Sequence, residues 1–185
     1  DSLAMADSTV IDTSKKKPEV TEENEEEKEK KKKIREKGTP FWVWNPVTQD
    51  TIVMDYVKRY RLSDKGNRVV TLTEVETDSV RISIIDPSKG RIKTILEGYG
   101  QVKLFSFDQK GEQLAFLFTD DTTDEKRYEI YYWKTGRAKA KPYLTDNTPG
   151  IKDGWGISRI RFPRFSKDGK YLNFGTEQLP VEEPE

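Results

Sequence analysis

The stretch Phe105-Ser-Phe-Asp-Gln-Lys-Gly-Glu-Gln-Leu114 decides the fold, because the chain repeats its pattern twice more. The two other copies are Tyr60-Arg-Leu-Ser-Asp-Lys-Gly-Asn-Arg-Val69 and Pro163-Arg-Phe-Ser-Lys-Asp-Gly-Lys-Tyr-Leu172. In each copy, mostly apolar residues two positions apart lead into a polar turn that contains glycine, and a second apolar alternation follows. This pattern predicts a β-hairpin. Because whole hairpins repeat, we expect stacked sheets.

The spacing of the turn glycines indicates the size of the repeated unit. Gly66 and Gly111 are 45 residues apart, whereas Gly111 and Gly169 are 58 residues apart. The excess of 13 residues corresponds to the loop 145–157, which is rich in glycine. A four-stranded unit of about 40–50 residues is typical of a β-propeller blade.

The second half of the unit repeats as well, at 41–50, 82–91 and 128–137, where an alternating strand precedes a turn rich in Asn, Pro, Asp or Gly. The fold class that we predict is all-β: a partial β-propeller of about three four-stranded antiparallel blades, preceded by a charged helical or disordered segment. A two-sheet sandwich with coincidentally similar hairpins is the alternative, and the repetition of both hairpins disfavours it. The predicted strands are 41–45, 48–54, 57–62, 67–74, 80–86, 90–96, 102–107, 112–118, 128–133, 138–144, 160–165 and 170–175.

These repeats suggest a division of the chain into three parts. We predict a charged linker or insertion at 1–37, propeller blades at 38–180 and a tail at 181–185. Within the blades, the predicted full blades are about 57–96 and 102–144, and the predicted half blades are 41–54 and 160–177.

The first 37 residues carry 10 basic and 11 acidic residues, and the remaining 148 carry 23 and 22. The segment has no apolar stripe, so we expect a solvated helix or a disordered linker; a charged arm that binds a partner is the alternative. Its start has neither the basic nor the apolar region of an intact signal peptide and no initiator methionine, which suggests a mature, trimmed or excised piece. The near-neutral remainder predicts no binding of nucleic acid or anionic membranes.

Whole classes of chemistry are excluded by composition. The chain has no cysteine, which removes disulfides, thiolate catalysis and cysteine-based zinc sites. It has no histidine, which removes the commonest general base and the usual partner of a serine nucleophile. There is no Gly-x-Ser-x-Gly motif, and no apolar run of 18 residues that could span a membrane. We therefore predict no catalytic, cofactor-binding or metal-binding residue in this chain, and no cofactor.

Four groups of residues are functional candidates. The glycine-rich segment 150–156 lacks a strand-to-helix context, so we expect a loop between blades, with Trp155 on a ligand path as the alternative. The carboxylates of 120–125 fit no calcium loop, so we expect an exposed turn. We expect the aspartates of the repeated turns to bond to the backbone; they are Asp64, Asp108 and Asp168. We expect strand aromatics to fill the space between blades: Trp42, Trp44, Tyr60, Phe105, Phe107, Phe116, Tyr131, Trp133, Phe165 and Phe174.

The segment from Phe165 to Pro180 resembles a blade hairpin of the β-propeller domains in the prolyl oligopeptidase family of serine peptidases, as do Leu114-Ala-Phe-Leu-Phe118 and the strand and turn at 128–137. The chain is most similar to large secreted or periplasmic members from Bacteroidetes-type bacteria, which carry a Lys/Glu-rich insertion before a strand like Gly38-Thr-Pro-Phe-Trp-Val-Trp-Asn45. The resemblance covers roughly 38–180. The Ser-x-Asp-Gly-Lys motif is shared with TolB-like propellers.

This resemblance implies a seven- or eight-bladed propeller that caps an α/β-hydrolase domain and restricts the entry of large substrates. No catalytic residue of the family has a counterpart here. We therefore expect a non-catalytic propeller segment of a serine peptidase, periplasmic or secreted, whose partners are the hydrolase domain of the same parent protein and peptide substrates. The alternatives are a non-enzymatic TolB-like binding or scaffold protein, and a three-blade assembly that forms an oligomer through open blade edges.

Overall fold

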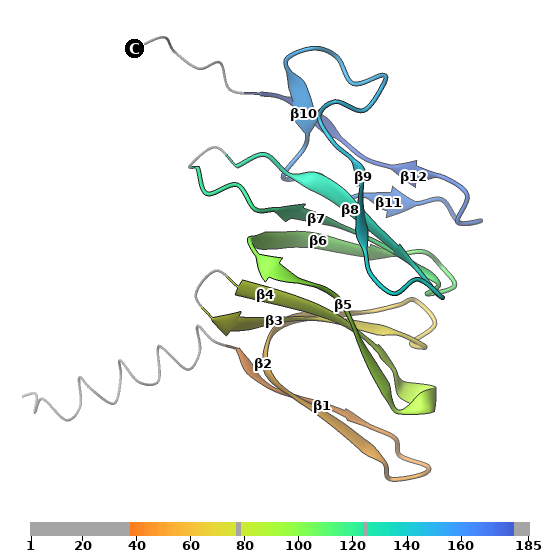
Figure 1. The fold of residues 1–185 in the computed structure, drawn as a ribbon. Helices are drawn as coiled ribbons and strands as arrows, with labels where there is room; N and C mark the ends of the chain where they lie inside the picture. The colour runs from red at the N-terminus through yellow and green to blue at the C-terminus, as the bar shows by residue number, and fades with distance from the viewer. Residues whose placement is uncertain (1–37, 77–78, 124–125, 180–185) are drawn as a thin grey trace, which may run out of the picture. The chain divides into compact units, whose positions relative to one another are not determined.

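A computed structural model describes residues 38–76, 79–123 and 126–179 (Figure 1). The predictions for 1–37 and 181–185 lie outside these residues. The described residues belong to one compact unit made of antiparallel strands. None of its elements is a helix long and apolar enough to cross a membrane.

Two large sheets and a broken hairpin succeed one another along the chain, as Figure 1 shows. The first sheet has the order β1-β2-β3-β4-β5, and its strands are Thr39–Trp44, Thr51–Leu62, Val69–Glu76, Ser79–Asp86 and Arg91–Tyr99; a short 3-10 helix, η1 (Pro87–Lys89), joins the last two. The second sheet has the order β6-β7-β8-β9, and its strands are Gln101–Phe107, Gln113–Thr119, Glu129–Lys134 and Lys141–Leu144. The third element pairs β10 with β13 and β11 with β12; these strands are Trp155–Ile157, Thr176–Gln178, Arg164–Phe165 and Leu172–Asn173.

Strand β2 differs from the prediction of two strands at 48–54 and 57–62. It runs without interruption from Thr51 to Leu62, pairing first with β1 and then with β3. The chain has no glycine or proline between these halves, so nothing ends the strand. A bulge takes up the change of partner instead, with Tyr56 at a φ of 58°. The assignment of 41–54 to a separate, preceding blade stays a prediction.

The third element also differs from its predicted form. The predicted strands 160–165 and 170–175 are reduced to β11 and β12, while β10 at the end of the glycine-rich loop pairs with β13. The loop is therefore shorter than predicted, and its last three residues belong to the sheet. Between β10 and β11 the chain departs from the ladder at 158–163. Pro163, which has no N–H to donate to a ladder, is the last residue of this segment. We call residues 158–163 the inner bulge.

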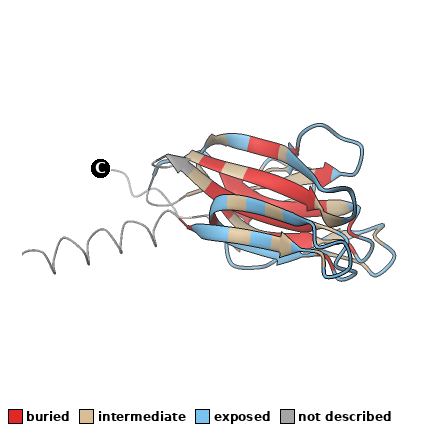
Figure 2. Cartoon of the chain, turned by 90° about the horizontal axis from the view of Figure 1, so that it is seen from below, coloured by how far each residue is buried: buried red, intermediate tan, exposed pale blue. Residues whose placement is uncertain are grey.

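Apolar side chains from neighbouring sheets form the core. Figure 2 shows the buried residues concentrated on the strands, with exposed residues on the loops at the sheet ends. One cluster joins the first two sheets and includes Leu72, Ile82, Phe116 and Trp133. A second cluster joins the second sheet to the broken hairpin and includes Ile130 among its buried residues. The sheets therefore pack face to face, as blades do.

The aromatic residues follow the prediction in the middle of the stack and depart from it at the β1–β2 hairpin. Phe105, Phe116 and Trp133 are buried, but Trp42 and Trp44 are exposed over 64% and 61% of their surface. They lie on the outer face of the hairpin, which no described sheet covers. Tyr60 is exposed as well, and its ring lies against that of Phe41.

The three repeated turns have the same hydrogen-bond pattern. In each, the residue three positions before the glycine accepts, through its side chain, the N–H of the residue two positions after the glycine. The acceptors are Ser63, Asp108 and Ser166, at 3.1, 2.9 and 3.0 Å. The prediction of a turn aspartate therefore holds for Asp108, whereas in the first turn Ser63 has the role that we expected of Asp64. Asp168 supports its own turn by accepting the N–H of Lys170 at 3.1 Å.

The first and second turns each donate a hydrogen bond to the next turn along the stack. The Asn67 side-chain amide donates to the backbone carbonyl of Lys110 at 3.0 Å. The Gln113 side-chain amide donates to the backbone carbonyl of Gly169 at 2.9 Å. These bonds connect the first turn to the second and the second to the third. We call this series the turn ladder.

Candidate functional site

Strands β2, β6 and β11 each lead into one of the repeated turns, and we count them as the first strands of three successive units. These strands converge at one edge of the stack. The Arg59 guanidinium on β2 donates to the carbonyl of Val102 on β6. The Arg61 guanidinium on β2 lies 5.9 Å from the ring centre of Phe162 in the inner bulge. This second contact joins the first and third units directly, past the unit between them. Sheets two apart can touch only where the stack narrows, so this edge faces the axis about which the blades are arranged.

A groove of about 480 Å³ lies at this inner edge. Lys58, Arg59, Tyr60 and Arg61 of β2 line one side. The other lining residues are Leu104, Phe105 and Phe162. A smaller hollow of about 230 Å³ shares Lys58 and Arg59 with the groove and extends past Gln101, Val102 and Lys103. The two hollows are therefore neighbours, and we call them together the inner groove.

The inner groove is basic. Lys58 forms an ion pair with Glu74. Arg59, Arg61 and Lys103 have no carboxylate within ion-pair distance among the residues that the structure describes. Two of these cations lie over aromatic rings, since Lys103 Nζ is 4.8 Å from the ring centre of Tyr128 and Arg61 lies over Phe162. A ring attracts a cation without neutralising it, so the positive charge stays available.

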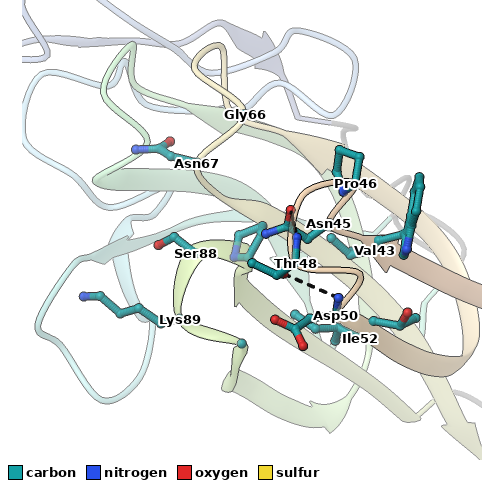
Figure 3. A pocket seen from close by; sticks show the side chains of 14 residues that line it. Val43, Asn45, Pro46, Thr48, Asp50, Ile52, Gly66, Asn67, Ser88 and Lys89 are labelled. Carbon is teal, nitrogen blue, oxygen red and sulfur yellow. Dashed lines mark hydrogen bonds between the residues drawn. The ribbon is translucent and has the colours of Figure 1, made fainter.

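A larger hollow of about 770 Å³ lies at the turn end of the first sheet (Figure 3). It is bounded by the β1–β2 turn, by Gly66 and Asn67, and by η1. Its polar groups are used to hold the β1–β2 turn, because Asn45 Oδ1 accepts the N–H of Val47 at 2.9 Å and Thr48 Oγ1 accepts the N–H of Asp50 at 3.4 Å. On the side of η1, Ser88 Oγ donates to Asp86 Oδ1 at 2.7 Å.

The acidic residues that the sequence singled out at 120–125 are partly described. Asp121 accepts the N–H groups of Thr123 and Arg127 at 2.9 and 3.1 Å, which closes a turn and lowers the pKa of Asp121. Next to it, burial raises the pKa of Glu129, and the nearby charges of Asp120 and Asp146 raise it further. Within the part of the chain that the structure describes, no group of three or more such side chains is arranged to hold a metal ion.

Trp155, the candidate for a ligand path, lies in β10 with Lys152 Nζ 5.8 Å from its ring centre. It is not among the residues that line the inner groove; Phe162 is the aromatic residue there. Sequence reasoning missed the basic inner groove, because its net-charge argument averaged over the whole folded part. The available signal was the density of Lys and Arg at 58–61 and 159–164, which lie on first strands or beside them.

No family model and no curated protein matches this chain. Solved structures do. The tricorn protease aligns with a TM-score of 0.50 and 15% identity over 74% of this chain and 13% of its own. TolB from Acinetobacter baumannii aligns with a TM-score of 0.44 and 15% identity, over 77% of this chain and 38% of its own. An acylaminoacyl peptidase from Pyrococcus horikoshii aligns with a TM-score of 0.42 and 14% identity, over 77% of this chain and 28% of its own.

The chain has the fold of a partial β-propeller. Its stacked antiparallel sheets, its repeated turns and its converging first strands establish this. Identities this low indicate a shared fold and nothing about function. The similar structures include both peptidases and TolB. The chain spans less than half the length of each of the three proteins just named.

Proposed function

We propose that this chain is a non-catalytic propeller segment of a prolyl-oligopeptidase-like serine peptidase. In this proposal it scaffolds and gates the access of peptides to an α/β-hydrolase domain elsewhere in the parent protein. The observation that carries it is the convergence of three units at the inner groove, through the contact between Arg61 and Phe162. Converging units arranged about an axis enclose a passage when the ring is complete, and a passage selects by size.

The β1–β2 hairpin supports the place of this segment in a larger ring. Trp42, Trp44 and Val53 share its outer face and are exposed over 64%, 61% and 44% of their surface. An apolar face of this kind is typical of one that a further sheet covers. In the proposal, a further blade of the parent propeller covers this face. Residues 41–54 are then half of a blade that precedes the one at 57–96. The other proposed boundaries are those of the sequence analysis.

The proposed mechanism is steric. Folded proteins are too wide for the passage, whereas short or unfolded peptides pass through it to the hydrolase domain. The chemistry must come from that domain, because this chain has no histidine to complete a Ser-His-Asp set. A Bacteroidetes-type, secreted or periplasmic parent is part of the proposal and is supported by the sequence resemblance.

Labelling of the native protein with a fluorophosphonate probe tests the proposal. We expect a labelled serine in a parent of several hundred further residues, and faster cleavage of short peptides than of a folded protein that contains the same sequence. A native protein of this size without labelling would refute the peptidase and favour the TolB-like binding or scaffold protein. Sedimentation would then test the oligomer, because a folded monomer in dilute solution contradicts closure by several copies.

A further inference from the structure

We propose that the inner groove, defined by Arg59, Arg61, Lys103 and Phe162, binds an extended acidic peptide. The inference goes beyond the proposed function, because it concerns binding by this chain alone and holds with or without a hydrolase domain. It rests on the charge of the groove, on the way its cations are held, and on its shape.

The charge of the groove is not that of the whole chain. The folded part carries nearly equal numbers of basic and acidic residues, so an even distribution would leave every surface close to neutral. Instead, three cations lie along the first strands without a carboxylate partner among the described residues. Walls of low dielectric constant concentrate the field of charges in a groove. A ligand with negative charges is therefore the complementary partner.

The aromatic residues distinguish a peptide from a nucleic acid. Binding of single strands needs open ring faces on which bases stack. Tyr128, under Lys103, is buried. The two exposed rings of the groove each have one face in contact already, since Tyr60 lies against Phe41 and Phe162 lies under Arg61. The groove therefore offers its cations more fully than its rings. Guanidinium and ammonium groups held in this way match carboxylates, and a guanidinium can bind one through two parallel hydrogen bonds.

The shape favours an extended chain. The main hollow crosses β2, β6 and the inner bulge, and the second hollow continues past Lys103. Leu104 and Phe105 give the groove an apolar lining between the cations. A peptide with carboxylates and intervening carbon stems fits this alternation of charged and apolar surface.

Fluorescence anisotropy with the full 185-residue chain tests the inference. The probes are fluorescein-labelled hexaglutamate, hexalysine and a short oligothymidylate. We expect hexaglutamate to bind and hexalysine not to bind. We also expect the affinity for hexaglutamate to fall about tenfold between ~50 and ~300 mM NaCl, because salt screens exposed charges. Equal binding of both peptides, or no binding of either, would overturn the inference, and tighter binding of the oligothymidylate would assign the groove to nucleic acid instead.

Variants locate the binding. The double variant Arg61→Glu/Lys103→Glu should weaken hexaglutamate binding at least ~30-fold, since two attractive contacts become repulsive. The matched control, Lys134→Glu/Lys141→Glu, makes the same charge change at exposed positions of β8 and β9, and we expect it to stay within about twofold of the parent chain. Equal losses in both variants would contradict a site in the groove. If circular dichroism shows that the charge reversal prevents folding, Arg61→Gln/Lys103→Gln removes the charges with less disturbance and must still weaken binding about tenfold.

Discussion

Replacement of Gly111 by alanine tests the turn ladder, and the same replacement at Gly66 is its control. Both glycines occupy the same position of the repeated turn and have nearly the same backbone conformation, with φ values of 72° and 66°. Their surroundings differ. A Cβ at Gly66 would meet no atom within 4 Å, whereas a Cβ at Gly111 would lie 2.5 Å from Asn67 Oδ1 and 2.9 Å from Ser63 Cβ.

The expected magnitudes follow from these distances. Left-handed backbone costs a residue with a Cβ about 1–2 kcal/mol, and this term is common to both variants. The alanine at 111 must also push the preceding turn away, which strains the bond from Ser63 Oγ to Asn67 Oδ1 and the bond from Asn67 to Lys110. Overpacking of this kind costs about 1–3 kcal/mol. Gly111→Ala should therefore lose about 2 kcal/mol more of the free energy of unfolding than Gly66→Ala.

Thermal unfolding followed by near-ultraviolet circular dichroism measures the difference. For a chain of this size, 2 kcal/mol lowers Tm by ~4–8 °C, so Gly111→Ala should melt that much below Gly66→Ala. Urea unfolding gives the free energies themselves and checks that the slope with denaturant is unchanged. Equal losses in the two variants would show that successive turns do not support one another, and the reasoning from the ladder would fail.

Three further predictions concern the core, one turn and pH. Phe116→Ala, which removes a fully buried ring between the first two sheets, should cost about 3–5 kcal/mol in urea unfolding, whereas Tyr171→Ala at an exposed ring should stay within ~0.5 kcal/mol; similar costs would contradict the two-sheet core. Asp108→Ala should cost about 2–3 kcal/mol, because two backbone N–H groups lose a charged acceptor, and a cost below ~0.5 kcal/mol would exclude this role. Glu129→Gln should raise Tm at pH 7. Burial raises the folded pKa of Glu129 above its usual 4.5, so its protonated form is favoured in the folded state and stability is lost as pH rises through that pKa. The gain should vanish below the usual pKa, near pH 3.5, and a gain of equal size at both pH values would refute the ionisation argument.

The fold was predictable because short-range features of the sequence determine the repeated hairpin. Apolar alternation and a glycine in a turn are properties of a few adjacent residues, and Gly66 and Gly111 both have the positive φ that their position in the pattern requires. Errors arose where local rules left a choice open. Nothing in the residues around Tyr56 shows whether a strand bends or ends there, and the pairing of β10 with β13 depends on residues some 20 positions away.

The inner groove could not be predicted in the same way. Arg61, Lys103 and Phe162 lie in three different units, and only the convergence of the first strands brings them to one place. Composition gave a correct net charge for the folded part but no information on how that charge is distributed. The prediction that Trp42 and Trp44 pack between sheets failed for a related reason. The alternating pattern of a strand is the same whether or not a neighbouring sheet covers its outer face.

The turn ladder has a direction. Asn67 donates forward to Lys110, and Gln113 donates forward to Gly169, so the middle unit accepts on one side through a carbonyl and donates on the other through a side-chain amide. A contact of this head-to-tail kind cannot be made between two identical faces, which excludes two-fold symmetry for it. Units joined by such contacts repeat in one direction, and they form a ring only where the rotation between units closes; otherwise they form an open array. The side-chain amides of one asparagine and one glutamine thus give the stack a polarity that a further unit at either end would have to match.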